Sequence, residues 1–175
     1  MSGKRFKGEL CVYCCSRRSR TGDHIFAREF FAVDQRADLP QAPTCDDCNN
    51  AKSQLEHYLT TVLPFGGRHL CAQQTLAAQV PRRLAKNLRL AREIRAGTGR
   101  VWHFQEGVLN YAMTVPIDHA RAAELFGQIG RGLAWYHFRI YLQPEHTASA
   151  LFLTRFGEEF FDRIFTINAA RREIQ

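Results

Sequence analysis

Two pairs of cysteines constrain the fold of this chain more than any other feature of its sequence. They form the motifs Cys11-Val-Tyr-Cys14 and Cys45-Asp-Asp-Cys48, each with a gap of two residues. A gap of this length lets one tight turn present two thiolates to a single metal ion, and Zn²⁺ in a structural site takes four ligands in a tetrahedron. We therefore predict that Cys11, Cys14, Cys45 and Cys48 hold one structural Zn²⁺.

Two more cysteines lie outside this set. Cys15 could replace its neighbour Cys14 as a ligand, but Cys14 is preferred because it makes the two motifs match. Cys71 has no partner motif, and we expect it to be a buried apolar residue. The segment between the two pairs, residues 15–44, is longer than in compact zinc ribbons, so additional structure is expected between them.

The charge of the chain favours a polyanionic partner. Its 175 residues carry a formal net charge of +7, and nucleic acid is the usual partner of a basic protein with a zinc motif. No apolar run approaches the roughly 18 residues of a membrane-spanning helix, and residues 1–7 lack the apolar stretch of a signal peptide. We expect a cytoplasmic protein, in which paired cysteines are more often metal ligands than disulfides.

The pattern of apolar and turn-forming residues predicts an α+β fold. In the first part of the chain, a short strand is expected at residues 23–26 and a loop at residues 27–41. Asn49 to about Leu63 is predicted to form a helix, which Asp46 or Asp47 could cap.

Gly66-Gly67 is the predicted boundary between an N-terminal domain, residues 1–66, and a mostly helical accessory domain, residues 67–175. The elements expected in the second domain are a helical stretch that Pro81 interrupts, a strand pair in residues 100–116, a long helix capped by Asp118, and a last helix with Phe156, Phe160, Ile164 and Ile167 on one side. The aromatic residues from Phe126 onward are expected in a core rather than stacked on bases. This domain is expected to contact DNA, to dimerise or to dock on a larger complex.

Between and after the cysteine pairs lie residues suited to phosphodiester hydrolysis. That reaction needs a base for the attacking water, a metal on the scissile phosphate and a cation near the developing charge. His24 suits the first role because imidazole titrates near neutral pH. Asp23 and Asn49 are hard oxygen donors for Mg²⁺ or Mn²⁺. Lys52, one turn after Asn49, could approach a phosphate oxygen, and Glu56 is expected to form a salt bridge.

The ordered set Cys-x-x-Cys, Asp-His, Cys-x-x-Cys-Asn-x-x-Lys-Ser resembles the HNH endonuclease family, which has the ββα-metal fold. The resemblance covers residues 11 to about 60. It implies a β-hairpin and a helix that grip one divalent metal beside a structural zinc, with His24 as general base and Asp23 and Asn49 as ligands of the catalytic metal. The nearest match to the family's middle asparagine, which orients the base, is Asp38, and a carboxylate there departs from the family pattern.

We therefore predict a metal-dependent DNA endonuclease, a phosphodiester hydrolase with Zn²⁺ and Mg²⁺ or Mn²⁺ as cofactors. The alternative, favoured by the Asp38 departure, is a zinc-stabilised DNA-binding or scaffold module without catalysis, within a larger nucleic-acid complex. One module has one active site, so a double-strand break would require a homodimer or two successive nicks.

A cluster of basic residues between Arg82 and Arg95 is a second candidate for contacts with DNA. Phosphate contacts add affinity without reading sequence. The alternative is a solvated helix face. The predicted DNA-contacting residues are Arg82, Arg83, Lys86 and Arg89.

Overall fold

The structure is a computed structural model that describes residues 5–67, 69–105, 107–143, 145–146 and 155–172. Its strands, α-helices and short 3₁₀ helices (η) follow one another in the order β1 (Thr21–His24), η1 (Arg28–Phe30), η2 (Val33–Gln35), β2 (Gln41–Thr44), α1 (Asp46–Val62), η3 (Leu63–Phe65), α2 (Leu70–Ala78), α3 (Val80–Lys86), α4 (Leu88–Gly97), β3 (Gly99–Gln105), β4 (Val108–Thr114), α5 (His119–Phe138) and α6 (Arg155–Arg172). The combination of helices with two small antiparallel sheets agrees with the predicted α+β class. None of the described helices has the length and apolar character needed to cross a membrane.

The N-terminal part is an antiparallel strand pair followed by a helix. Strands β1 and β2 pair with His24 opposite Gln41. The chain leaves β2 and enters α1 through Cys45, whose extended backbone makes it the N-cap residue. The expectation that Asp46 or Asp47 caps this helix is wrong, because both residues lie inside its first turn. There, their carboxylates face the positive end of the helix dipole.

The later elements also follow the sequence pattern. Pro81 stands in the first turn of α3, where its missing N–H is not needed, and so separates α3 from α2. Strands β3 and β4 form an antiparallel hairpin with Trp102 opposite Tyr111. The carboxylate of Asp118 caps α5 by accepting from the N–H groups of Ala120 and Arg121, as predicted.

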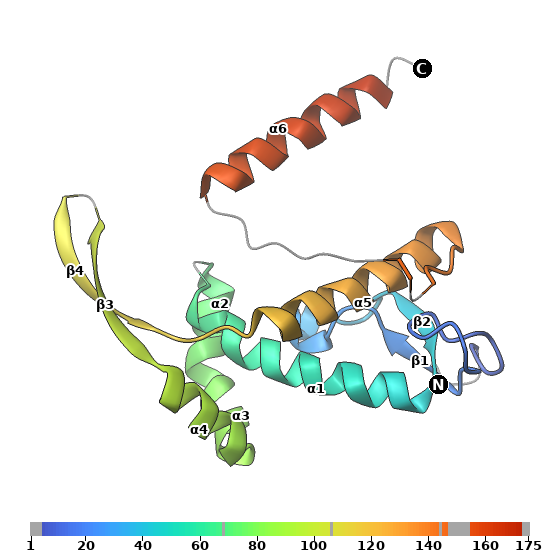
Figure 1. The fold of residues 1–175 in the computed structure, drawn as a ribbon, viewed down its shortest axis with the longest axis horizontal. Helices are drawn as coiled ribbons and strands as arrows, with labels where there is room; N and C mark the ends of the chain where they lie inside the picture. The colour runs from blue at the N-terminus through green and yellow to red at the C-terminus, as the bar shows by residue number, and fades with distance from the viewer. Residues whose placement is uncertain (1–4, 68, 106, 144, 147–154, 173–175) are drawn as a thin grey trace.

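One hydrophobic core joins the segments 1–66 and 67–175. Helix α5 packs along α1 and against β2 (Figure 1), and the core contains residues of all three elements. At Gly132 of α5, a Cβ atom would lie only 3.0 Å from two side-chain carbons of Ile25, so the absence of a side chain lets α5 approach the end of β1. The core therefore places α5 directly behind the cysteine motifs and the strand pair.

Several apolar side chains are exposed instead of buried. Cys71 is exposed, which corrects the expectation that it lies in a core. Among the aromatic residues, Trp135 is buried, whereas Tyr136 and Phe138 are exposed. Phe152 and the side chains of Phe156, Phe165 and Ile167 lie outside the described residues.

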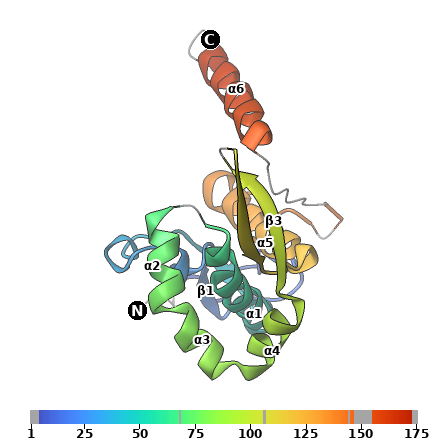
Figure 2. The ribbon, with the colours of Figure 1, turned by 90° about the vertical axis from the view of Figure 1, so that its left-hand side faces the viewer.

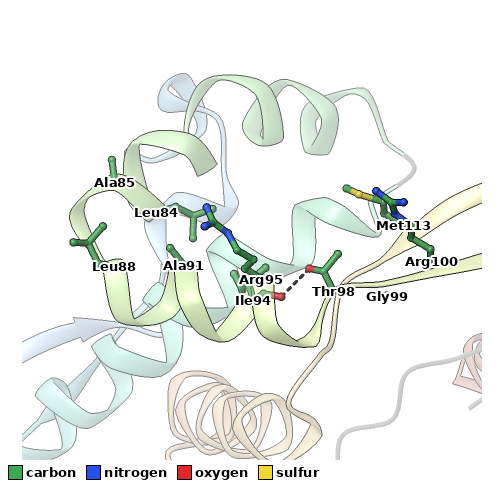
Figure 3. Close-up of a pocket in the computed structure, with 10 residues that line it drawn as sticks. All are labelled: Leu84, Ala85, Leu88, Ala91, Ile94, Arg95, Thr98, Gly99, Arg100 and Met113. Carbon is green, nitrogen blue, oxygen red and sulfur yellow. Dashed lines mark hydrogen bonds between the residues drawn. The ribbon is translucent and has the colours of Figure 1, made fainter.

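Two elements extend away from the shared core. The β3–β4 hairpin projects from α4 in Figure 1, and α6 stands apart from the other elements in both Figure 1 and Figure 2. A hollow of about 830 Å³ lies where α3, α4 and the hairpin meet (Figure 3). Its walls are mostly apolar, with Arg95 and Arg100 as the charged side chains among its lining residues. They include no carboxylate, histidine or cysteine, so this hollow is a poor candidate for hydrolytic chemistry.

Candidate functional site

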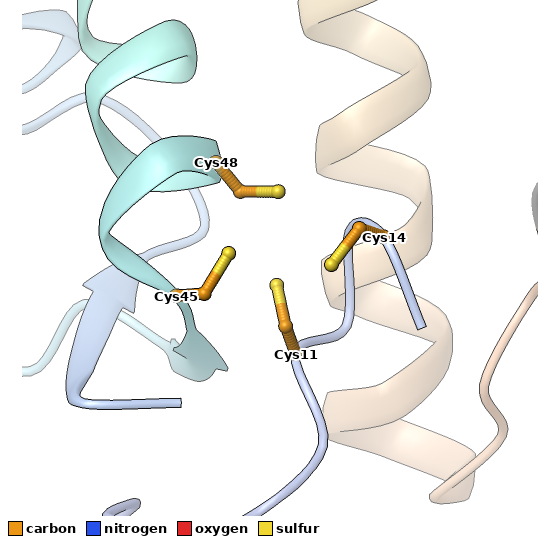
Figure 4. Close-up of side chains that lie close together, drawn as sticks. All are labelled: Cys11, Cys14, Cys45 and Cys48. Carbon is orange, nitrogen blue, oxygen red and sulfur yellow. The ribbon is translucent and has the colours of Figure 1, made fainter. Parts of the chain in front are cut away.

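The cysteine pairs converge on one point. The sulfur atoms of Cys11, Cys14, Cys45 and Cys48 all lie within 4.8 Å of one another (Figure 4). Four thiolates bound at about 2.3 Å to a tetrahedral Zn²⁺ would be about 3.8 Å apart, so this cluster fits such an ion. Cys15 is not part of the cluster; its thiol donates to the carbonyl oxygen of Leu142 at 3.5 Å. The predicted set of four cysteines is confirmed as a cluster that can bind a metal.

The first cysteine pair is held in place by backbone hydrogen bonds. The N–H of Cys11 donates to the carbonyl of Arg17 at 2.9 Å, and the N–H of Val12 donates to the carbonyl of Pro43 in β2 at 3.1 Å. A left-handed residue, Cys15, with φ of 50°, follows the turn. The turn with Cys11 and Cys14 is therefore fixed against the strand that leads into Cys45, and the four sulfur atoms meet because β2 and α1 are consecutive.

The ionisation of the thiols also favours a bound cation. Burial raises the pKa of Cys11 and of Cys48, and neighbouring thiolates raise both further. Burial opposes ionisation of Cys14 as well, but hydrogen bonds from Ser16 and Arg17 outweigh it and lower its pKa to about 6. Four thiolates at such short distances repel one another, and a divalent metal removes that penalty by binding them all.

Beside the cysteines, Lys52 is the centre of a buried polar cluster. Its side chain is 0% exposed, and its ammonium lies 3.0 Å from Oδ2 of Asp23. The ammonium also donates to the backbone carbonyl of His24 at 2.8 Å and to the carboxylate of Glu56. The hydroxyl of Tyr13 donates to the same Oδ2 of Asp23 at 2.7 Å. All three donors of the ammonium are thus used inside the protein.

This arrangement corrects the expected role of Lys52. The sequence places Lys52 on the same helix face as Asn49, but that face of α1 packs against the end of β1, so the ammonium reaches Asp23 instead of solvent. The expected salt bridge of Glu56 is present, with Lys52 as its partner. Burial raises the pKa of Glu56, while the ammonium of Lys52 opposes this rise.

The imidazole of His24 has a different neighbour from the one expected. Nε2 of His24 lies 3.0 Å from Nε2 of Gln41, the residue opposite it in the strand pair. Asp38 is exposed in the loop before β2, and the described hydrogen bonds of His24 do not include it. Burial lowers the pKa of His24, and the positive charge of Arg28 lowers it further. The imidazole is therefore neutral at neutral pH, which is the state that a general base requires.

Asn49 lies in the first turn of α1, directly after Cys48. It is half-buried, and its backbone N–H donates to the carbonyl of Cys45 at 3.0 Å. Residues three apart on a helix share a face, so the Asn49 side chain projects from the same side of α1 as Lys52, which contacts Asp23. The helix thus carries Asn49 on the side that faces the end of β1.

The four predicted DNA-contacting residues of α3 and α4 divide into two groups. Arg83 donates to the carbonyl of Thr60 at 2.5 Å and to Oε1 of Gln79 at 2.8 Å, so its guanidinium fastens α3 to the end of α1. Arg82, Lys86 and Arg89 are exposed. Of the four predicted DNA contacts, these three are accessible to a partner.

Two residues of the site were missed by sequence reasoning. Tyr13 lies in the gap of the first cysteine motif, and its position there does not indicate that its hydroxyl donates to Asp23. Gln41 meets His24 through the register of the strand pair, and a short strand gives no sequence signal for register. Comparison of the chain with protein-family models, curated proteins and solved structures finds no match.

Proposed function

We propose that this protein is a metal-dependent DNA endonuclease of the HNH type, which hydrolyses phosphodiester bonds. One observation carries the proposal: an antiparallel strand pair and the helix after it bring Asp23 and His24 next to Lys52, one turn from Asn49, beside a four-cysteine cluster. The strand-strand-helix order and the residue types both agree with the resemblance noted in the sequence.

In this proposal His24 is the general base. Its neutral imidazole takes the proton from the attacking water, which becomes a stronger nucleophile for the scissile phosphorus. The contact with Gln41 at 3.0 Å holds the ring in one orientation. The bond from Lys52 to the backbone carbonyl of His24 fixes the strand end that carries the ring.

Asp23 and Asn49 are the proposed ligands of Mg²⁺ or Mn²⁺. Their carboxylate and amide oxygens are the hard donors that these ions prefer. The bonds from Tyr13 and Lys52 both go to Oδ2 of Asp23, so Oδ1 is the oxygen offered to an ion. When bound there, the metal would polarise the scissile phosphate and stabilise the leaving oxygen. The cysteine cluster, with all its ligands from the chain, is the proposed structural Zn²⁺ site.

The exposed cations of α3 and α4 are proposed to contact the DNA backbone. Arg82, Lys86 and Arg89 are exposed, and they belong to a chain with a formal net charge of +7. Such contacts would hold the nucleic-acid backbone without selecting its sequence.

A second candidate is a zinc-stabilised nucleic-acid-binding or scaffold module without catalysis. The contact between Lys52 and Asp23 favours it, because an internal cation already neutralises the carboxylate that would bind the metal. The carboxylate of Asp38, at the position of the family's orienting asparagine, also favours it.

Plasmid cleavage separates the two candidates. We expect the zinc-loaded protein to nick or cut plasmid DNA with Mg²⁺ or Mn²⁺ and to lose this activity with EDTA. The His24→Ala variant should keep its fold and zinc but lose activity by about 100-fold or more, the usual contribution of a general base. The matched control is His57→Ala, since His57 is an exposed histidine on α1 and should be dispensable.

Undiminished cleavage by purified His24→Ala protein would remove His24 from the mechanism. Binding of DNA by a wild-type protein that cleaves with neither metal would favour the second candidate.

A further inference from the structure

A groove of about 330 Å³ shares one residue, Gln41, with the surroundings of the proposed base His24. It is built by three segments: the N-terminal arm, the residues leading into β2, and the C-terminal end of α5. Its lining includes Arg5, Asp38, Gln41, Tyr136 and Arg139. The volume falls within the range of about 300–1,000 Å³ typical of small-ligand sites. Gln41, which contacts the imidazole of His24, is part of its wall, so the groove leads to the proposed base.

Two arginines of this groove each lie over an aromatic ring. The guanidinium of Arg5 lies 5.3 Å from the ring centre of Phe6, and that of Arg139 lies 4.2 Å from the ring of Trp135. The rings of Phe6 and Trp135 contact each other edge to face at 5.8 Å. Phe6 and Trp135 are 3% and 4% exposed, so the core fixes both rings and they orient the two cations.

Neither arginine forms a salt bridge with another described residue. The salt bridges found in the described part of the chain involve neither Arg5 nor Arg139. Asp38 is the one carboxylate among the lining residues and is exposed. Two positive charges with fixed positions are thus available to an anionic ligand, and Asp38 is available to a hydrogen-bond donor.

The backbone of Arg139 points to a use for its side chain. Arg139 is the C-cap of α5 and has a left-handed conformation, with φ of 57° and ψ of 28°. Glycine is the usual residue at a left-handed helix end, because a Cβ atom is strained there. An arginine at this position places a cation on the groove in spite of the strain, a pattern found at functional sites.

We propose that this groove binds one unpaired strand of nucleic acid, as the segment that flanks the phosphate to be cleaved. The inference rests on the proposed nuclease function. Arg5 and Arg139 bind two phosphates of the strand. Tyr136, 43% exposed on the groove, stacks on a base, and Asp38 accepts a hydrogen bond from a base amino group. A base inside a duplex is already stacked and cannot lie on Tyr136, so the groove selects single-stranded or locally opened substrate.

Binding without cleavage tests this proposal. The zinc-loaded full chain is titrated, without Mg²⁺ or Mn²⁺, into a fluorescent oligonucleotide of about 12 nucleotides, a length in the range that one binding groove covers. DNA, RNA and duplex DNA of one sequence form three arms, and anisotropy is followed over a range of salt concentrations. We expect a single strand to bind more tightly than the duplex, and the DNA and RNA arms identify which strand is preferred.

Arg139→Gly is the decisive variant, because glycine suits the left-handed backbone and the thermal midpoint should not fall. We expect it to weaken single-strand binding by about tenfold and to reduce the salt slope by about 0.7, the value for one phosphate contact on a single strand. Tyr136→Ala should weaken binding by about tenfold through lost stacking. Arg163→Ala, which removes an equal charge from α6, is the matched control and should change affinity by less than about twofold.

Wild-type affinity and salt slope in both Arg139→Gly and Tyr136→Ala would overturn the proposal, as would a preference for duplex. If these results were found while cleavage still depended on His24, the groove assignment would fail and the nuclease would stand. If strand binding depended on Arg139 and Tyr136 but the protein did not cleave DNA, the groove assignment would stand and the nuclease proposal would fail.

Discussion

At the scale of single residues, the site depends on which nitrogen of His24 is free to accept a proton. Gln41 lies 3.0 Å from Nε2. Its amide can donate to Nε2, or its oxygen can accept from Nε2–H when the amide is turned. Only the second arrangement leaves Nδ1 unprotonated in the neutral ring. In the structure the amide nitrogen faces Nε2, so the amide donates and the neutral ring carries its proton on Nδ1. For Nδ1 to receive the proton from water, the amide of Gln41 must be turned.

The pair of Gln41 and His24 leads to a prediction about pH. Burial and Arg28 lower the pKa of His24 from its ordinary 6.5, and a base works only when unprotonated. The activity of the wild type should therefore fall only below about pH 6.5. In Gln41→Glu, the new carboxylate stabilises the imidazolium and raises this pKa, so the loss of activity should begin at higher pH. Gln41→Ala should be slower with little shift, and kcat/KM measured against pH compares the three proteins.

If the activity of Gln41→Glu fell at the same low pH as that of the wild type, Gln41 would have no influence on the pKa of His24. The pKa of His24 would then be set by burial and by the charged side chains around it, of which Arg28 has the largest effect.

At the scale of elements, the cysteine motifs supply more than four possible metal ligands, because the first motif also supports Asp23. The turn with Cys11 and Cys14 carries Tyr13, whose hydroxyl donates to the carboxylate of Asp23 at 2.7 Å. From the other side, α1 brings Lys52 to the same oxygen. The four-cysteine cluster brings that turn next to α1, so it sets the distance between the two groups that orient the proposed ligand.

Tyr13→Phe isolates this connection. The variant keeps the buried ring but removes the hydroxyl, and a hydrogen bond to a charged group contributes about 1.5–3 kcal/mol. We expect the free energy of unfolding to fall by about 2 kcal/mol and cleavage to slow by about tenfold, with one Zn²⁺ per chain retained. Denaturant unfolding, cleavage rates and zinc analysis measure these effects. Wild-type stability and rate together would show that the turn with Cys11 and Cys14 does not support Asp23.

The elements also show where sequence reasoning stops. The cysteine spacing, the helical period of residues 49–63 and the capping position of Asp118 are local signals, and the structure has the cluster, the helix and the cap that they predict. The contacts of Lys52 and Gln41 depend instead on how α1 packs on β1 and on the register of the strand pair. Spacing shows which residues share a helix face but not which neighbour covers that face, so it does not reveal that Lys52 lies in the interior.

At the scale of the whole molecule, the two segments predicted from Gly66-Gly67 depend on each other. Helix α5 contributes Leu125, Ile129 and Trp135 to the same core as Leu55 and Leu59 of α1. Arg139 ends α5 and lines the groove. The packing of α5 therefore both supports the strand pair and forms one wall of the groove. The proposed catalytic residues and the proposed strand-binding groove therefore belong to a single folded unit.

This dependence predicts that residues 1–66 do not fold alone, even with zinc. Each large apolar side chain that loses its cover gives up about 1.5–3 kcal/mol. Removal of α5 uncovers several such side chains at once, a loss comparable with the 5–15 kcal/mol or so that stabilises a whole domain. With one equivalent of Zn²⁺, residues 1–66 should show no cooperative thermal unfolding and little dispersion of amide NMR signals. Residues 1–146, which keep α5, should show both. Cooperative unfolding of the shorter fragment would mean that the zinc and the strand pair form a stable module without α5, and that α5 serves the groove alone.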